Sequence, residues 1–428
     1  MPTTRGWLVG GVGACLVVAG MGFGARPLEQ LGIALIALVL LAAAVVRLGK
    51  HDLDVSRIVV PQRARADQDV TVTLILKNSG AGAAPLLLLE DNLPSTLAGR
   101  ARFALNGIEP DGKRAVSYVV RPHRRGRYTV GPLSMRMIDP FGLARVSAEA
   151  ASTESFLVHP RIESLGLPRD AGDRRSVSTS TFKQPTGTRG EDFYALREYV
   201  QGDDLRKVHW PSTARRDRIM IRQEETPWHT RATVVLDDRR SAHGGSGSAT
   251  SFERAVEATA SVLQLYHSAG YGFRLVGAEH PGVASARGVA HLHRCLDLLA
   301  TMELQSDRGE DPLLARLLEI EARGAGEETL IAVTGTLTTE VAVALTRLRR
   351  VFKQIVCVSF PAHRFSSAST KQRWAGEQDT VEATRHLARS GIRSVVVGPG
   401  DSLEGAWRSF AGKPRGGEAT WAQRPELV

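Results

Sequence analysis

The sequence predicts a multidomain protein with three folded parts: a two-helix transmembrane hairpin, an immunoglobulin-like β-sandwich, and an α/β Rossmann-like parallel sheet. Two long apolar runs lie near the N-terminus. Apolar and polar residues then alternate with a period of two over residues 52–160, as in half-buried strands. From residue 232 onward, continuous apolar strands alternate with helical patterns, as in a parallel sheet covered on both faces. With 428 residues, the chain is too long for one ordinary hydrophobic core.

The N-terminal segment, residues 1–50, predicts two membrane spans. The spans cover about residues 7–24 and 28–46, and a short turn at Arg26 separates them. Crossing the hydrocarbon core takes about 20 apolar residues, and a helical hairpin keeps every backbone polar group bonded within lipid. A cleaved signal peptide is the alternative for the first run. The second span directly behind it favours a hairpin anchor.

Flanking cations predict the orientation of this hairpin. Only Arg26 lies in the turn, whereas four cations lie outside the spans: Arg5, Arg47, Lys50 and Arg57. The positive-inside rule then places both ends in the cytoplasm. We therefore expect a two-span protein of the cell membrane whose soluble domains are cytoplasmic. Three widely spaced cysteines agree with a reducing compartment.

Composition narrows the class of partner. The formal net charge of +10 disfavours acidic partners less than basic ones, and it suits an anionic lipid surface better than nucleic acid. No zinc-finger spacing or RNA-binding signature favours nucleic acid. We expect membrane contact, no nucleic acid, and no cofactor. The sequence leaves the oligomeric state open.

The β-sandwich is predicted over residues 52–160. Val70, Val72, Leu74 and Leu76 alternate with more polar residues, and turn signals such as Asn106-Gly107 separate similar short runs. About a hundred residues with this many short strands are typical of an immunoglobulin-like sandwich. This part carries no catalytic pattern, so we interpret it as a spacer or docking module.

Residues 161–231 form a basic linker that contains a signature block. The block combines cations, carboxylates and aromatic side chains at: Arg197, Tyr199, Gly202, Asp203, Asp204, Arg206, His209, Trp210 and Arg215. Buried charges need fixed partners, so we expect defined ion pairs here. The block resembles the signature of the domain-of-unknown-function fifty-eight (DUF58) family. A second segment supports this resemblance, with Arg124–Tyr128, Gly131–Leu133 and the Asp139-Pro140-Phe141-Gly142-Leu143 run.

The α/β domain is predicted over residues 232–412, followed by a flexible tail over residues 413–428. Its first strand ends at Asp237. The loop Asp237-Asp238-Arg239-Arg240-Ser241 resembles the Asp-x-Ser-x-Ser metal loop of von Willebrand factor A domains. Asp237 and Ser241 match this pattern, but Arg239 replaces the first serine. The strand predicted at Thr329–Val333 runs into Thr334-Gly335-Thr336, where such domains present an aspartate. We therefore expect a degenerate metal-site loop without a metal ion, in which Arg239 pairs with Asp237 or Asp238.

Three functions stay open. The first is a membrane-anchored cytoplasmic scaffold or adaptor that docks other proteins; the DUF58 resemblance implies a MoxR-type AAA+ ATPase as partner. The second is a hydrolase or phosphotransferase that uses Asp203, Asp204 and His209, with Arg206 and Arg215 clamping an anion. The third is a cation-dependent adhesion-type module, which Arg239 disfavours.

The signature block has no ordered nucleophile and base. We favour its interpretation as a structural lock or docking surface, in which Trp210 fills an apolar hollow, and predict that the protein is not an enzyme.

Overall fold

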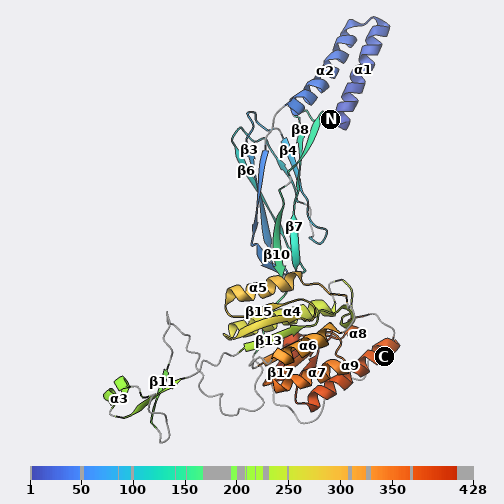
Figure 1. The fold of residues 1–428 in the computed structure, drawn as a ribbon. Helices are drawn as coiled ribbons and strands as arrows, with labels where there is room; N and C mark the ends of the chain where they lie inside the picture. Colours follow the sequence, from blue (N-terminus) through green and yellow to red (C-terminus); the bar gives the residue numbers. More distant parts are fainter. Residues whose placement is uncertain are drawn as a thin grey trace. The chain divides into compact units, whose positions relative to one another are not determined.

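The structure is a computed structural model of the whole chain (Figure 1). It describes the following residues: 2–48, 53–84, 86–97, 101–139, 141–150, 152–166, 194–199, 208, 210–216, 218–224, 231–247, 250–306, 311–323, 329–366 and 370–411. The predicted tail at residues 413–428 lies outside them. The chain divides into two compact units, residues 1–162 with 293–303 and residues 163–292 with 304–428.

The two apolar runs form two antiparallel helices, α1 (Thr4–Phe23) and α2 (Arg26–Leu48), which pack side by side (Figure 1). Both are long and apolar enough to cross a membrane. Helix α1 begins where the Thr3 side chain accepts a hydrogen bond from the Gly6 amide, and it ends at Gly24 in the left-handed conformation. A Cβ atom at Gly32 would lie 2.5 Å from the Gly13 carbonyl oxygen, so glycine allows the helices to approach closely here.

The predicted strand-rich part is a two-layer β-sandwich. Its first layer has the strand order β1-β3-β6, and the opposite layer is built from the orders β2-β10-β7 and β5-β4-β8-β9. The strands are: β1 (Leu53–Val60), β2 (Arg63–Arg65), β3 (Val70–Asn78), β4 (Leu86–Asp91), β5 (Ala101–Leu105), β6 (Lys113–Val120), β7 (Gly126–Val130), β8 (Leu133–Ile138), β9 (Arg145–Ala150) and β10 (Glu154–His159). Strand β3 follows the predicted alternation, because Val70, Val72, Leu74 and Leu76 are fully buried.

Two apolar clusters fill this unit. One contains Leu74 and Leu76 of β3 together with Val39, Ala42 and Val46 of α2. The other lies toward the opposite end of β3: Val59, Ala64, Val70, Val72, Leu97, Val120, Tyr128, Val130, Phe156 and Val158. Helix α2 therefore shares one hydrophobic core with the sandwich.

Arg57 has a different role from the predicted one. We counted it among the cations that flank the membrane, but its side chain is 1% exposed inside the sandwich. Its Nη2 atom lies 2.5 Å from Asp91 Oδ1, and its Nη1 donates to the Ser152 carbonyl. Tyr118 donates its hydroxyl to Asp91 Oδ2 at 2.5 Å. The pKa of Tyr118 is raised, mainly because its hydroxyl is buried and secondly because it is hydrogen-bonded to Asp91.

The described part of the signature block forms an antiparallel strand pair with a short helix in the connection (Figure 1). Strand β11 (Tyr194–Glu198) pairs with β12 (Met220–Glu224). Helix α3 (Trp210–Arg216) lies between them in sequence. The Thr213 side chain accepts a hydrogen bond from the Met220 amide at 3.0 Å, which ties α3 to β12.

The α/β part contains a six-stranded sheet with the order β15-β14-β13-β16-β17-β18. We predicted a parallel sheet, and five strands are parallel, but β15 pairs with β14 in the antiparallel direction. The sheet is therefore mixed. Its strands are: β13 (Arg231–Leu236), β14 (Gly272–Gly277), β15 (Val283–Ala286), β16 (Thr329–Thr334), β17 (Gln354–Ser359) and β18 (Arg393–Val396).

Helices alternate with these strands along the chain, as the pattern predicts. They are: η2 (Arg240–Ala242), α4 (Ser251–Ser268), α5 (Val289–Thr301), α6 (Pro312–Arg323), α7 (Thr339–Arg347), η3 (Leu348–Arg350), α8 (Ala362–Phe365), α9 (Thr370–Arg389) and α10 (Leu403–Ala411). Buried residues of α6, α7 and α9 form one core with Val235, Leu330 and Ile355 of the sheet. Helix α4 packs on β13, β14 and β16. Thr250 caps α4, because its side chain accepts a hydrogen bond from the Glu253 amide.

We predict that Asp91→Ala lowers the free energy of unfolding of the first unit by about 3–5 kcal/mol, because it leaves the Arg57 guanidinium buried without a counter-charge. The matched control is Glu90→Ala. Glu90 forms an exposed pair with Arg102, which contributes about 1 kcal/mol or less. Hydrogen exchange of β3 peptides during urea titration of the detergent-solubilised full chain measures both variants. Equal losses for the two would contradict the role of the buried pair.

Candidate functional site

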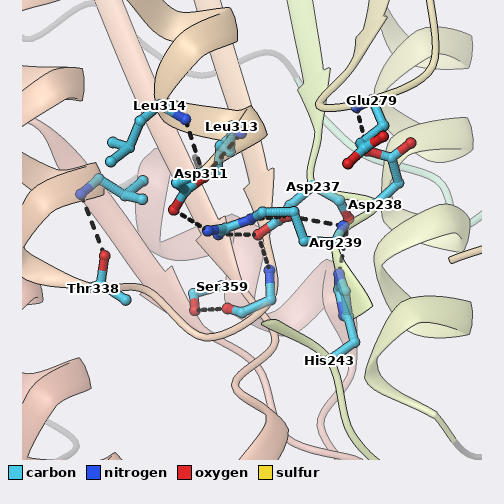
Figure 2. Close-up of polar contacts among 12 residues, drawn as sticks. Asp237, Asp238, Arg239, His243, Glu279, Asp311, Leu313, Leu314, Thr338 and Ser359 are labelled. Carbon is cyan, nitrogen blue, oxygen red and sulfur yellow. Dashed lines mark hydrogen bonds and ion pairs between the residues drawn. The ribbon is translucent and has the colours of Figure 1, made fainter. Parts of the chain in front are cut away.

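A cluster of buried charges lies at the carboxyl end of β13 (Figure 2). Strand β13 lies between β14 and β16. The chain passes from β13 to β14 on one side, and it later returns to β16 on the other side, so the strand order reverses at β13. Ligands of open α/β sheets bind at such a reversal, beyond the carboxyl ends of the strands. Asp237 and Asp238 follow β13 directly, and both are 0% exposed. This is the position that the sequence analysis assigned to the metal-site loop.

The Arg239 side chain folds back onto Asp237 (Figure 2). Its Nε lies 2.8 Å from Asp237 Oδ1, and its Nη2 lies 2.8 Å from Asp237 Oδ2, which makes a bidentate pair. The Arg239 backbone amide adds a bond of 3.2 Å to Asp237 Oδ1. The expected pairing of Arg239 with Asp237 is therefore present, and the guanidinium is 6% exposed.

A second carboxylate, Asp311, completes this ion cluster, and the sequence analysis missed it. Arg239 Nη1 donates to Asp311 Oδ2, while Asp311 Oδ1 accepts from the amides of Leu313 and Leu314 at the start of α6. Asp311 is therefore the N-cap of a helix whose first residue is proline. The Asp-Pro pair could have predicted the cap, but nothing local could have predicted its contact with Arg239, 72 residues away.

The loop after β16 closes the other side of Asp237. The Gly335 amide donates to Asp237 Oδ2 at 3.3 Å, and Ser359 donates its hydroxyl to the Gly335 carbonyl at 2.7 Å (Figure 2). A Cβ atom at residue 335 would lie 2.2 Å from the Ala242 carbonyl oxygen. Glycine is therefore required at residue 335, and its backbone amide supplies the contact to Asp237.

Asp238 faces away from Arg239 and fixes the segment after β14. Its carboxylate accepts from the amides of Glu279 at 2.9 Å and His280 at 3.2 Å, and it lies 2.5 Å from His280 Nδ1. The alternative pairing of Arg239 with Asp238 is not the one that forms. Asp238 instead anchors the turn that precedes β15.

His243 supports the same loop from beneath. Its Nε2 lies 2.8 Å from the Asp237 carbonyl oxygen, and its Nδ1 lies 2.9 Å from Ser251 Oγ. A neutral ring that carries its proton on Nε2 satisfies both contacts. The ring packs edge-on against Phe252. Burial outweighs the attraction of Asp237 and lowers the pKa of His243 below 6.5.

The third residue of the predicted loop does not join the ion cluster. Ser241 lies in η2, and its side chain is exposed. The predicted loop therefore divides, with Asp237 and Arg239 in the buried cluster and Ser241 at the surface. Among the residues that the structure describes, no group of three or more His, Cys, Asp or Glu side chains is placed to hold a metal ion.

The signature block is described only in part. Gly202, Asp203, Asp204, Arg206 and His209 lie outside the described residues. Arg197 pairs with Ile221 in the strand register, and Tyr199 donates its amide to the Ile219 carbonyl at 2.9 Å.

The two signature residues on α3 lie at the surface. Arg215 is exposed. The expectation that Trp210 fills an apolar hollow is wrong, because its side chain is 70% exposed. A seven-residue helix presents this side chain outward instead of packing it in a core.

A surface depression lies at the carboxyl ends of β17 and β18. Its volume is about 540 Å³, and it is lined by: His363, Arg364, Trp374, Glu377, Gly398, Pro399, Gly400 and Asp401. Glu377 bonds to both His363 and Arg364. Burial opposes ionisation of Glu377, but these bonds outweigh it and lower the pKa of the carboxyl.

In the buried cluster, Arg239 bonds to both carboxylate oxygens of Asp237 and to Asp311. A guanidinium stays protonated at all ordinary pH values, so Arg239 cannot act as a base. It also satisfies the Asp237 oxygens that an octahedral divalent cation would need. The arrangement holds three chain segments together: the loop after β13, the start of α6 and the loop after β16.

We predict that Arg239→Ser lowers the free energy of unfolding of the second unit by about 3–5 kcal/mol in the absence of metal, because Asp237 loses its buried counter-charge. Millimolar Mg²⁺ or Mn²⁺ should recover part of this loss, since the serine opens oxygen ligands around Asp237. Thermal unfolding with and without metal measures both effects. The matched control is Arg240→Ser at the exposed neighbouring position, which should behave as the parent protein. Equal losses in both variants would contradict the assignment.

We predict that the second unit loses stability as the pH falls below 6.5. The folded-state pKa of His243 is depressed, so the unfolded chain binds more protons between that value and 6.5, and the stabilisation is complete only above 6.5. Glu377 acts in a separate window below 4.5. Denaturant titrations between pH 4.5 and pH 6.5, above the Glu377 window, should show a shallower pH slope for His243→Gln than for the parent. An unchanged slope would exclude His243 as the cause.

Solved structures resemble this chain over about a quarter of its length. The CARDB domain of the PF1109 protein from Pyrococcus furiosus, solved in complex with di-metal ions, is 17% identical and covers 25% of this chain and 91% of that chain, with a TM-score of 0.19. The putative ApaA protein from Bordetella pertussis is 12% identical and covers 25% of this chain and 94% of that chain, with a TM-score of 0.20.

Sequence comparisons support the DUF58 resemblance. The "Uncharacterized protein YeaD" of Bacillus subtilis (strain 168) is 24% identical over 276 residues, which cover 62% of this chain and 66% of that protein, just under two thirds of its length. Residues 195–360 match the family model described as "Protein of unknown function DUF58". From β11 to the end of β17, the chain is therefore similar to proteins of the DUF58 family.

Proposed function

We propose that this protein is a membrane-anchored adaptor that docks other proteins on the cytoplasmic side of the cell membrane. In this proposal the α1–α2 hairpin is the anchor, the β-sandwich is an immunoglobulin-like spacer, and the α/β part is a von Willebrand factor A-like docking domain. The partner is a MoxR-type AAA+ ATPase, a class that the DUF58 resemblance suggests.

The anchor rests on length, composition and charge. Helices α1 and α2 have mean hydropathies of 1.8 and 2.3 over their candidate spans. Apolar side chains on them are exposed, among them Trp7, Leu8, Leu40 and Leu41, which a bilayer would cover. With Arg57 assigned to the sandwich core, Arg5, Arg47 and Lys50 still outnumber Arg26 in the turn, which favours cytoplasmic ends.

One observation carries the choice of docking over catalysis: the Arg239 guanidinium lies where a von Willebrand-like loop would hold its cation. Asp237 is fully buried and bidentately bonded, so the strand end that would otherwise bind a ligand is occupied by the protein's own side chain. A domain whose metal loop is closed in this way keeps its fold and its surface. Its surface is then the part that can recognise a partner.

Helix α3 carries exposed side chains that suit docking to a partner. Trp210 is 70% exposed, so its apolar surface is accessible to a partner. Tryptophan and arginine dominate the energetics of protein interfaces, and Arg215 is exposed on the same short helix. The DUF58 match begins at residue 195 and includes this helix. We assign Trp210 and Arg215 to the partner-binding surface.

We predict that Trp210→Ala weakens binding to the ATPase by about thirtyfold or more, as loss of an interface hot spot of about 2 kcal/mol implies. The matched control is Trp374→Ala, because Trp374 is 67% exposed but lies on α9 outside the signature block. Both variants should unfold at the parent temperature, since neither side chain is buried.

Isothermal titration calorimetry of the detergent-solubilised full chain with a purified MoxR-type ATPase measures the affinity of the parent and of each variant for the ATPase. Loss of binding in Trp374→Ala alone would move the docking surface away from α3. No binding by the parent protein would remove the ATPase from the proposal.

A further inference from the structure

The Asp139–Leu143 turn between β8 and β9 belongs to a motif that the proposed docking role leaves unused. It carries an exposed phenylalanine: Phe141 is 65% exposed at the tip of the turn. Hydrogen bonds join the described residues of the turn. Asp139 is 3% exposed, and its carboxylate accepts from the amides of Phe141 and Ala144, while the Gly142 amide donates to the Asp139 carbonyl at 2.9 Å.

This turn is bonded to the start of α1. The Thr3 amide donates to the Leu143 carbonyl at 2.8 Å, and the Thr3 hydroxyl donates to the Gly142 carbonyl at 2.6 Å. The same Thr3 oxygen caps α1 by accepting from the Gly6 amide. A Cβ atom at Gly6 would lie 2.1 Å from the Leu143 carbonyl oxygen, so only glycine permits this approach. In Figure 1 the N-terminus lies beside the end of β8.

The residues around Phe141 have the composition of a membrane interface. Arg5 and Trp7 are exposed in the first turn of α1, and a Cβ at Gly142 would lie 4.0 Å from the Arg5 guanidinium. Leu143 and Ala144 join the core that contains Val39 and Val46 of α2. Aromatic side chains favour the level of the lipid headgroups, and nearby arginines favour anionic lipid phosphates.

We propose that the Phe141 turn is a membrane-contact element: Phe141 inserts at the boundary between headgroups and acyl chains beside the entry point of α1, and Arg5 binds anionic phospholipid headgroups there. This inference rests on the proposed membrane anchor. The occupant is the bilayer, because the Thr3 hydrogen bonds and the close approach of Gly6 hold the turn against the start of α1, where Trp7 and Leu8 are exposed. The element fixes the sandwich against the membrane surface in one orientation.

Site-specific fluorescence on the full chain tests the inference. Cysteines are placed at Phe141, at Leu8 and at Val119 in a Cys15→Ala background, because Cys295 and Cys357 are buried and Cys15 is exposed. Each variant is labelled with the environment-sensitive dye NBD. The labelled chains are placed in nanodiscs of phosphatidylglycerol and phosphatidylcholine in equal parts, with a spin-labelled phospholipid as quencher.

The three positions separate the possible outcomes. Leu8 is 65% exposed on α1 and reports on the anchor itself. Val119 is 58% exposed but pairs with Thr71, at the end of β3 that lies in the cluster without α2, so it is the apolar negative control. We expect strong quenching at positions 8 and 141 and little at 119. Quenching at 8 with position 141 resembling 119 would overturn the inference and leave the anchor standing. No quenching at position 8 would overturn both.

Two further variants test the contacts that place the turn. Gly6→Ala should push the turn away from α1, so quenching at position 141 should fall while quenching at position 8 persists. Arg5→Gln should reduce quenching at position 141, because it removes the charge that binds anionic headgroups. Nanodiscs of phosphatidylcholine alone should have the same effect, and unchanged quenching in both would contradict the role of Arg5. Insensitivity of position 141 to Gly6→Ala would show that α1 does not position the turn and would contradict the proposed mechanism.

Discussion

The ion cluster of Asp237, Arg239 and Asp311 is the constraint on which the α/β part depends. Two carboxylates and one guanidinium share a site in which the Asp237 side chain is fully buried, so each charge is tolerated only because the others are present. The cluster joins the loop after β13 to the start of α6, and the Gly335 amide adds the loop after β16. The side chains of Arg239 and Asp237 therefore hold three segments together at the carboxyl edge of the sheet.

This constraint explains the geometry of the strand end, because the Arg239 guanidinium bonds to both carboxylate oxygens of Asp237. Exposed aromatic side chains lie elsewhere in the chain, at Trp210 on α3 and at Phe141 in the sandwich. In the proposed adaptor, a partner would bury the apolar area of Trp210 and the bilayer would bury that of Phe141, and this burial would supply binding energy.

Local patterns predicted much of the fold, and distant contacts account for the errors. Alternation in β3 and the long apolar runs of α1 and α2 are signals that a short window contains. The four-residue β15 is half-buried at an edge and carries too weak a pattern to predict. Arg57 was assigned to the membrane flank by its position after the second run; only tertiary packing of two different sheets brings it to Asp91. Asp311 escaped notice for the same reason, because tertiary contact alone joins it to Arg239.

The most direct test of the account is a high-resolution crystal structure of the parent chain grown with Mn²⁺, with anomalous diffraction to locate the ion. The account predicts guanidinium density between Asp237 and Asp311 and no anomalous peak within coordination distance of Asp237. A manganese ion ligated by Asp237, with the Arg239 side chain turned away, would contradict it.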